Sequence, residues 1–348
     1  MKSEDLVKSN EGPRQPPKKH HMTTSWPFKP RYTWNILMWY VWLLHVLPDL
    51  EVPNPPKLPK SAKVPFLAEY KQWLWILPRA LVPFAIHRAY YEYNDGKAWS
   101  PLMAHVFFGY AFQVYAVICI RKMNDLAARY GYFDSEVKRD GVPDVYVTKI
   151  FISLVFVVFF RLFLGMFLFY DPYEKPTLSP WLPVYIFAYA VVLDFWFYVY
   201  HRAMHDIPWL WKYHRVHHLT KHPNPILSAF ADVEQEIGDN LLVPLLTSIT
   251  LRPDFTTWFI VQAFVVYTET MGHSGIRAYI PAPATGYILR HLGLEICVED
   301  HDKHHSRGWR KSFNYGKQTR IWDTLFGTAR PREESRDDNI DWNHPVSF

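Results

Sequence analysis

The sequence has only two cysteines among its 348 residues, Cys119 and Cys297, and their contexts predict no framework of disulfide bonds. Its formal net charge of +5 is modest, and beside long apolar segments it indicates attraction to anionic lipid surfaces rather than nucleic-acid binding. Residues 1–21 contain basic residues with no apolar core directly behind them, so we predict no cleavable secretory signal. The class of protein therefore depends on the apolar segments and on the histidines.

Long apolar segments are the first informative feature. Residues 147–170 and 181–200 each reach the roughly 20 apolar residues that cross a bilayer, and residues 100–120 nearly do. Residues 34–50 and 72–91 are weaker candidates because proline or charge interrupts them. The sequence therefore predicts an all-α membrane protein, a bundle of four or more transmembrane or re-entrant helices with a cytosolic helical cap.

The chain divides into four regions by composition. We expect a disordered polar tail at 1–30, a membrane-entry region with the first transmembrane helices at 31–180, a histidine-bearing region at 181–330, and a polar C-terminal tail at 331–348. Lysine and arginine residues near both ends indicate that the ends lie in the cytosol.

Histidine is concentrated in two short stretches. Six of the 17 histidines lie within residues 201–222, and three more lie within residues 301–305. Imidazoles spaced i, i+4 or i, i+3, i+4 lie on one face of a helix. A single such pair is more often a packed or surface pair, but three groups in one chain favour a metal site of iron, zinc, copper or nickel. The three groups are His201 and His205; His214, His217 and His218; and His301, His304 and His305.

The segment between the two histidine stretches has two possible courses. Residues 241–270 are apolar, but Arg252, Pro253 and Asp254 interrupt them, so a single bent helix and a hairpin are both compatible with the pattern. If both stretches serve one site, the chain has to return to its starting side. We therefore predict a returning hairpin that brings His273 and the second stretch beside the first.

The ordered motifs HRAMH, HRVHH, GHSG and HDKHH, followed by FNYG and WDTLFGT, resemble those of the fatty acid hydroxylase/sterol desaturase superfamily. The resemblance covers about residues 185–330, and it implies that region 181–330 is a catalytic domain of a membrane-bound di-iron oxygenase. It also implies that the histidine-rich cap holds two metals. The ligands implied are His201, His205, His214, His217, His218, His273, His301, His304 and His305.

The sequence departs from the family pattern at one point. Relatives often carry a His-Pro pair three residues before a glutamate, whereas this chain has Val233 and Glu234 ahead of Glu236. Asp232 and Glu234 are the two candidates to replace this auxiliary ligand.

Two carboxylates are candidates for catalytic roles beside the ligands. Asp194 lies seven and eleven residues before the first two histidines, spacings that return to nearly the same helix face. We expect it to accept a hydrogen bond from a ligand imidazole, the alternative being an ion pair with Arg161, which also lies at membrane depth. Glu269 precedes His273 by four residues, and we expect a similar role for it.

The resemblance implies an O2-dependent oxidoreductase that hydroxylates, oxidises or desaturates a C–H position of a lipid-like substrate. Sterols, sphingoid or fatty acyl chains, and terpenoid or polyketide metabolites all stay open. The implied cofactors are two iron ions and O2, because iron supplies an oxidant that side chains lack. Electrons are expected from NAD(P)H through a separate cytochrome b-type carrier and its reductase, since no His-Pro-Gly-Gly haem motif occurs. The implied location is the endoplasmic reticulum membrane, multi-pass, with the active site facing the cytosol.

Two other functions use the same histidines. A zinc-dependent membrane hydrolase or isomerase is one, although HRAMH lacks the glutamate of a His-Glu-x-x-His protease helix. A metal transporter is the other, but its ligands would lie within the spans, whereas these histidines follow them.

Overall fold

The fold is described from a computed structural model that covers residues 19–348, without the side chains of residues 19, 20 and 156–158. The α-helices are α1 Ile36–Leu43, α2 Pro48–Glu51, α3 Glu69–Tyr93, α4 Pro101–Tyr130, α5 Val147–Phe169, α6 Leu182–Asp206, α7 Pro208–His214, α8 Val233–Ile237, α9 Val243–Thr250, α10 Phe255–Gly272, α11 Gly286–Leu289, α12 Val298–Arg307 and α13 Ile321–Leu325. A π-helix spans Gly238–Leu242, and the two strands are β1 Val64–Phe66 and β2 Ile340–Pro345.

Three helices of the described residues, α4, α5 and α6, are long and apolar enough to cross a membrane. They coincide with the three strongest apolar segments of the sequence. The weaker candidate at 72–91 forms part of α3, a long helix that contains Pro78 and Pro83 and does not reach this apolarity. The described residues therefore supply three candidate spans, whereas the prediction was a bundle of four or more.

The segment between the histidine stretches is a helical hairpin, as predicted. α8, the π-helix and α9 follow one another without a break, and the chain reverses at residues 251–254 before α10. Asp254 begins α10 by accepting hydrogen bonds from the backbone nitrogen and hydroxyl of Thr257. α10 is buried along almost its whole length and packs against α3, α4, α5 and α6. It is therefore the central helix of the core, and it delivers His273 at its end.

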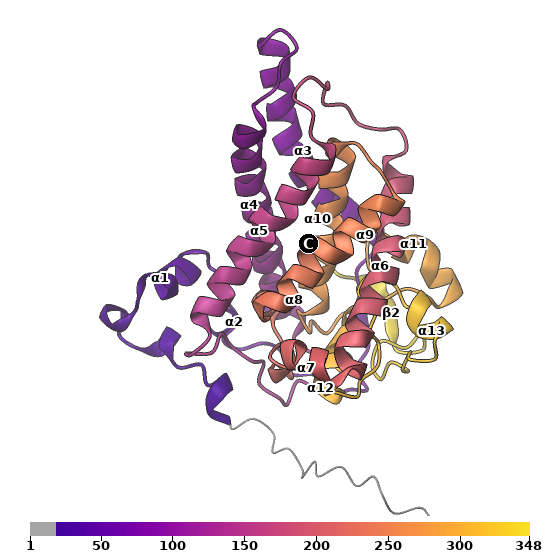
Figure 1. Cartoon of the computed structure of the whole chain (residues 1–348). Helices are drawn as coiled ribbons and strands as arrows, with labels where there is room; N and C mark the ends of the chain where they lie inside the picture. The colour runs from indigo at the N-terminus through magenta and orange to yellow at the C-terminus, as the bar shows by residue number, and fades with distance from the viewer. Residues whose placement is uncertain (1–18) are drawn as a thin grey trace, which may run out of the picture.

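The histidine-bearing elements lie at one end of the molecule. Figure 1 shows α7, α12 and the C-terminal part of α6 gathered there, opposite the end at which α3 turns into α4. Short helices and loops carry most of the histidines at the ends of the long helices, and their role as a helical cap stays a prediction. Sidedness relative to a membrane stays a prediction.

The prediction of an all-α fold needs one correction, because a two-stranded parallel sheet joins β1 and β2. Val346 beyond β2 donates its backbone N–H to Phe66, 2.7 Å away, and the ring of Phe348 stacks on Trp75. The C-terminal segment, predicted from the sequence to be a polar tail, returns to the body, where Ile340 and Val346 are buried.

The predicted disordered tail, residues 1–30, also needs a correction. Residues 1–18 lie outside the described residues, but residues 21–30 pack on the body. Trp26 is buried and donates its indole N–H to the carbonyl of Val142, and the carboxylate of Asp144 accepts hydrogen bonds from the backbone nitrogens of Ser25 and Trp26. The composition of this tail predicted disorder. The burial of Trp26 and the hydrogen bonds of the Asp144 carboxylate instead hold residues 21–30 against the body.

Candidate metal centre

Four separate parts of the chain deliver nine buried histidines to one place. α6 contributes two from its last turns, α7 and the 3-10 turn after it contribute three, and α12 contributes three. His273 follows the last residue of α10. All nine predicted ligands therefore come together, as the hairpin requires.

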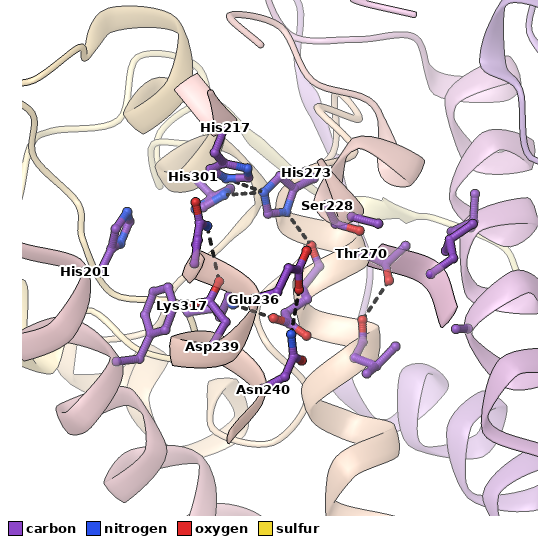
Figure 2. A pocket seen from close by; sticks show the side chains of 18 of the residues that line it. His201, His217, Ser228, Glu236, Asp239, Asn240, Thr270, His273, His301 and Lys317 are labelled. Carbon is purple, nitrogen blue, oxygen red and sulfur yellow. Dashed lines mark hydrogen bonds and ion pairs between the residues drawn. The ribbon is translucent and has the colours of Figure 1, made fainter. Parts of the chain in front are cut away.

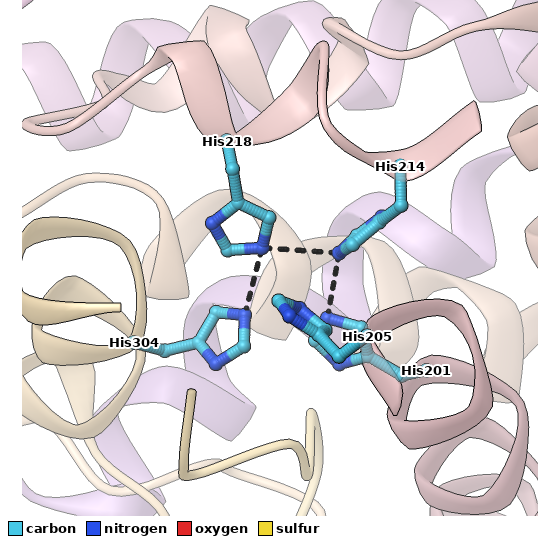
Figure 3. Close-up of side chains that lie close together, drawn as sticks. All are labelled: His201, His205, His214, His218 and His304. Carbon is cyan, nitrogen blue, oxygen red and sulfur yellow. Dashed lines mark hydrogen bonds between the residues drawn. The ribbon is translucent and has the colours of Figure 1, made fainter. Parts of the chain in front are cut away.

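The first group contains five imidazoles, shown in Figure 3, whose ligand nitrogens lie within 4.8 Å of one another. The Nε2 atoms of His201 and His214 are 3.0 Å apart, and those of His214 and His218 are also 3.0 Å apart. The Nε2 atoms of His218 and His304 are 3.1 Å apart. His205 completes this group.

The second group contains four imidazoles, His217, His273, His301 and His305, again with ligand nitrogens within 4.8 Å of one another. The Nε2 atom of His273 lies 3.3 Å from that of His217 and 3.1 Å from that of His301. Figure 2 shows these three rings pointing toward one another.

The two groups cut across the sequence motifs. His217 and His218 are adjacent in the chain but belong to different groups, and so do His304 and His305. Successive residues of a helical turn point about 100° apart, so adjacent histidines reach two neighbouring centres. The rings of His218 and His305 are only 4.8 Å apart between centroids, which places the groups side by side.

One loop fixes three imidazoles of the first group. Between residues 310 and 315, backbone carbonyls accept hydrogen bonds from Nδ1 of three histidines. The pairs are His205 to Arg310 (3.0 Å), His304 to Phe313 (2.6 Å) and His201 to Tyr315 (2.8 Å). A carbonyl only accepts, so each Nδ1 carries the proton and each Nε2 presents its lone pair to the centre of the group.

Four further imidazoles are fixed in the same way from other segments. Each donates its Nδ1–H to an oxygen at 2.9 to 3.0 Å. The pairs are His217 to the Phe230 carbonyl, His273 to the Glu269 carbonyl, His305 to the Thr220 carbonyl and His214 to Oε1 of Gln235. Such partners set the tautomer and ring orientation that a metal ligand needs.

The arrangement fits metal ions. With the protons on Nδ1, the Nε2 lone pairs face one another at about 3 Å, which is repulsive unless a cation lies between them. Metal–imidazole bonds of about 2.1 Å at right angles would give about this separation. Nε2 of His205 and Nε2 of His305 are buried and have no hydrogen-bond partner among residues 19–348. Burial lowers the pKa of His217 to about 3 and that of His273 to about 4, so both rings are neutral at physiological pH.

Asp194 does not make the expected contact. Its buried carboxylate accepts hydrogen bonds from the backbone nitrogens of Lys317 (2.6 Å), Gln318 (2.7 Å) and Thr319 (3.1 Å) and from the Thr319 hydroxyl (2.6 Å). No bond joins it to an imidazole or to Arg161 among the described residues. The loop that follows Tyr315 lies against this carboxylate instead, and the Tyr315 carbonyl at the start of that loop accepts from His201.

Glu269 also acts differently from the expectation. Its backbone carbonyl, not its carboxylate, accepts the hydrogen bond from His273. The carboxylate pairs with the ammonium of Lys317 and lies 3.4 Å from the guanidinium of Arg161. Burial alone would raise the pKa of Glu269, but these two cations lower it to about 2. Arg161 therefore has its partner in Glu269.

Neither candidate for the auxiliary ligand reaches the histidines. Asp232 pairs with Lys149, and Glu234 is exposed. The sequence reasoning missed Gln235, whose side chain joins His214 to Asp239 by bonds of 2.9 and 3.2 Å. No motif marks it.

Tyr200 of α6 packs against the segment that carries Gln235. The Tyr200 hydroxyl donates to the backbone carbonyl of Gln235 at 3.2 Å, and the π-helix begins at Gly238. A Cβ atom on Gly238 would lie 2.3 Å from the Tyr200 ring, so only glycine permits this packing. π-Helical turns are frequent at functional sites.

A cavity of about 70 Å³ adjoins both groups, and Figure 2 shows its lining. Histidines of both groups form one wall, and apolar side chains of α4, α5 and α10 form another. Glu236, Asp239, Glu269 and Lys317 supply charged groups. Burial and the neighbouring Asp239 raise the pKa of Glu236 to about 8, and its carboxyl group accepts a hydrogen bond of 2.6 Å from the Asn240 amide.

Comparison with known proteins gives a consistent result. Residues 186–328 match the model of the fatty acid hydroxylase family. The chain is 38% identical over 310 residues to fatty acid hydroxylase vlmA of Lecanicillium sp, covering 82% of this chain and 84% of the relative. It is 33% identical over 162 residues to Delta(7)-sterol-C5(6)-desaturase of Nicotiana tabacum, covering 44% of this chain and 54% of the relative.

A third relative, cholesterol 25-hydroxylase of Homo sapiens, is 27% identical over 164 residues, covering 46% of this chain and 56% of that protein. No solved structure matches the chain. The relatives include hydroxylases and a desaturase, and one of them matches most of the chain at 38% identity. The chain therefore belongs to the fatty acid hydroxylase/sterol desaturase superfamily.

Proposed function

We propose that this protein is a membrane-bound di-iron hydroxylase that inserts one oxygen atom of O2 into a C–H bond of a fatty acyl chain. The second oxygen atom leaves as water, so a turnover consumes two electrons and two protons with the C–H bond and O2. The proposal rests on one observation above the others, which is the nine imidazoles arranged as two adjacent groups beside a partly apolar cavity. A fatty acyl substrate is preferred because the relative that matches most of the chain is a fatty acid hydroxylase.

The histidines are the proposed ligands of two iron ions. His201, His205, His214, His218 and His304 would hold one, and His217, His273, His301 and His305 the other. Iron there would supply the oxidising power for a nonactivated C–H bond, which side chains cannot supply. Burial keeps the rings neutral, and the carbonyls that accept from Nδ1 keep them oriented, so the ligand set is arranged before a metal enters.

Asp194 is proposed as a positioning residue rather than a catalytic one. It holds residues 317–319 by four hydrogen bonds, and the same loop presents the Tyr315 carbonyl to His201. A change at this carboxylate therefore reaches the first group through the loop.

Glu269 is proposed to offset the positive charge of Lys317 in the cavity. Its carboxylate lies against Lys317, whose ammonium also lies 4.1 Å from the centre of the Phe197 ring. An unpaired ammonium in the cavity would oppose entry of an apolar chain, because burying an isolated charge is costly. Glu269 and Lys317 together let the cavity combine an apolar wall with fixed polar groups.

The wider setting follows from the family resemblance. We propose the endoplasmic reticulum membrane, with the histidines on the cytosolic side, so that a lipid substrate moves from the bilayer to the cavity without crossing water. NAD(P)H would supply the electrons through a separate cytochrome b-type carrier and its reductase. The helix ends that carry the histidines lie together at one end of the three candidate spans, which supports this arrangement.

Isotope labelling tests the proposal. Cells that express the protein are grown under ¹⁸O2, and their total fatty acids are compared by mass spectrometry with those of cells that express His205→Ala. A hydroxyl group that carries ¹⁸O from O2, present only with the unmodified protein, is the expected product. A new double bond without ¹⁸O would show that the protein is a desaturase instead of a hydroxylase.

Oxygen from water instead of O2 would indicate the zinc-dependent hydrolase and would overturn the proposal. Sterols and sphingoid bases are extracted from the same cells. A labelled product in one of those fractions, with none among the fatty acids, would support an oxygenase that acts on a sterol or a sphingoid base instead of a fatty acyl chain.

A further inference from the structure

Two tryptophans connect the first histidine group with the protein surface. The ring of Trp309 meets that of Trp211 edge to face, with centroids 5.1 Å apart. The Trp211 ring lies 5.2 Å from His205 and 5.8 Å from His218. Trp211 is 5% exposed, whereas Trp309 is 37% exposed. Two ring contacts therefore lead from solvent to imidazoles of the first group.

The backbone follows the same route. The residue after Trp309, Arg310, accepts the Nδ1 hydrogen bond of His205 with its carbonyl. The ammonium of Lys221 lies 4.9 Å from the centre of the Trp309 ring and donates to the carbonyl of Gly308. The exposed tryptophan is thus held in place, and its loop touches a proposed ligand directly.

The two segments that meet at this contact carry charge of one sign. Residues 207–231 and residues 303–322 contain no aspartate or glutamate. Among their basic side chains, five have no ion-pair partner in the part of the chain that the structure describes. These are Lys212, Arg215, Lys221, Arg310 and Lys311, of which Lys212, Arg215 and Lys311 are exposed.

We propose that Trp309 with Lys212, Arg215, Lys221 and Lys311, here called the Trp309 surface, binds an acidic one-electron carrier protein. The inference rests on the proposed function, because only a reaction that consumes electrons needs such a partner. Each encounter oxidises the carrier by one electron, which enters at the tryptophan pair. Two encounters supply the two electrons that, with two protons, end in the water released by each turnover.

An anionic lipid surface is the other partner that basic residues and an exposed tryptophan fit. It would account for the lysines and arginines. It would not account for the ring contacts that continue inward from Trp309 through Trp211 to His205 and His218. The carrier accounts for both observations.

Binding tests the surface without any turnover. The full chain, loaded with zinc and held in phosphatidylcholine nanodiscs, is titrated with the oxidised, soluble haem domain of a cytochrome b-type carrier that has acidic net charge. The variants are Arg215→Glu, Lys311→Glu and their combination. The matched control is Lys97→Glu, an exposed lysine in the turn between α3 and α4, at the opposite end of the molecule.

The double variant is expected to bind the haem domain about tenfold more weakly than the control at low salt, and the difference is expected to vanish near 0.5 M salt, where charges are screened within about 4 Å. Equal affinities of the double variant and the control would overturn the proposal. So would a haem domain that does not bind while the same substitutions abolish binding to phosphatidylserine vesicles, because the surface would then be a lipid surface.

Electron entry is measured separately on iron-loaded protein. Turnover driven by the reduced haem domain is divided by turnover driven by a small viologen mediator that needs no docking. This ratio is expected to fall about tenfold in Trp309→Leu and to be largely restored in Trp309→Phe, which keeps an aromatic ring. If Trp309→Leu gives the same ratio as the unmodified protein, electrons do not enter through the tryptophan pair. Absence of mediator-driven turnover in the unmodified protein would instead count against the proposed function. The binding experiment would still show whether the Trp309 surface binds the haem domain.

Discussion

Asp194→Asn should loosen one of the two metal sites and leave the other intact. The asparagine can keep its carbonyl where Oδ1 accepts from Lys317 and Gln318, and its amide can donate to the Thr319 hydroxyl. The backbone N–H of Thr319 then loses its acceptor, and the remaining bonds lose their charge. An unpaired buried donor costs about 1–3 kcal/mol, and bonds to a charged group are about twice as strong as neutral ones. We expect a loss of about 3 kcal/mol in unfolding free energy.

The effect on metal binding follows from the shared loop. Tyr315, two residues before Lys317, accepts from His201, whereas no imidazole of the second group is held by residues 310–319. Loss of an outer partner of a ligand typically costs about 10–100-fold in metal affinity. Iron release to a chelator should therefore become biphasic, with one ion per chain released faster and the other at the rate of the unmodified protein.

Asp144→Asn is the matched control, because Asp144 also accepts four hydrogen bonds from a loop, at Ser25, Trp26 and Lys29, but holds no part of the site. It should lower thermal stability and leave iron release unchanged. If Asp194→Asn lowers stability while both ions leave at the unmodified rate, the loop does not position His201, and the reasoning is refuted.

Three further outcomes are expected. Gln235→Ala removes the acceptor of His214 and should weaken iron binding about 10–100-fold, measured by competition with a chelator, whereas an unchanged affinity would show that this bond does not matter. Burial lowers the pKa of His217 to about 3 and that of His273 to about 4, so protons should compete with the metal only near those pH values. The iron content after gel filtration should therefore stay constant from pH 8 down to about pH 5. Iron loss with a midpoint near the unperturbed histidine pKa of about 6.5 would contradict this. Chelation should remove the metals and leave the helices folded, because apolar packing around α10 holds them; loss of the far-ultraviolet circular dichroism signal on chelation would show the opposite.

Local pattern predicted much of this molecule. Length and apolarity indicated the three candidate spans, and the spacing of four placed His201 and His205 on one face of α6, because both properties depend on residues that are close in sequence. The same spacing did not indicate that the triplets at 214–218 and 301–305 divide between two groups. The hairpin at 241–270 was predictable from the chemistry, since two histidine stretches that serve one site have to meet.

The contacts that arrange the site were not predictable in the same way. Backbone carbonyls such as that of Arg310 carry no side-chain signature, and no residue pattern marks the bond between Gln235 and His214. Asp194 lies on the expected helix face, but a loop more than a hundred residues later occupies the space beside it. The pairing of β1 with β2 likewise joins segments from opposite ends of the chain.

The central claim is that two histidine groups each hold one metal ion. Metal analysis of freshly purified, iron-reloaded protein tests it most directly, together with His205→Ala in the first group and His273→Ala in the second. We expect about two ions per chain in the unmodified protein and about one in each variant, with activity lost in both. A metal content near zero in fully active protein would contradict the claim.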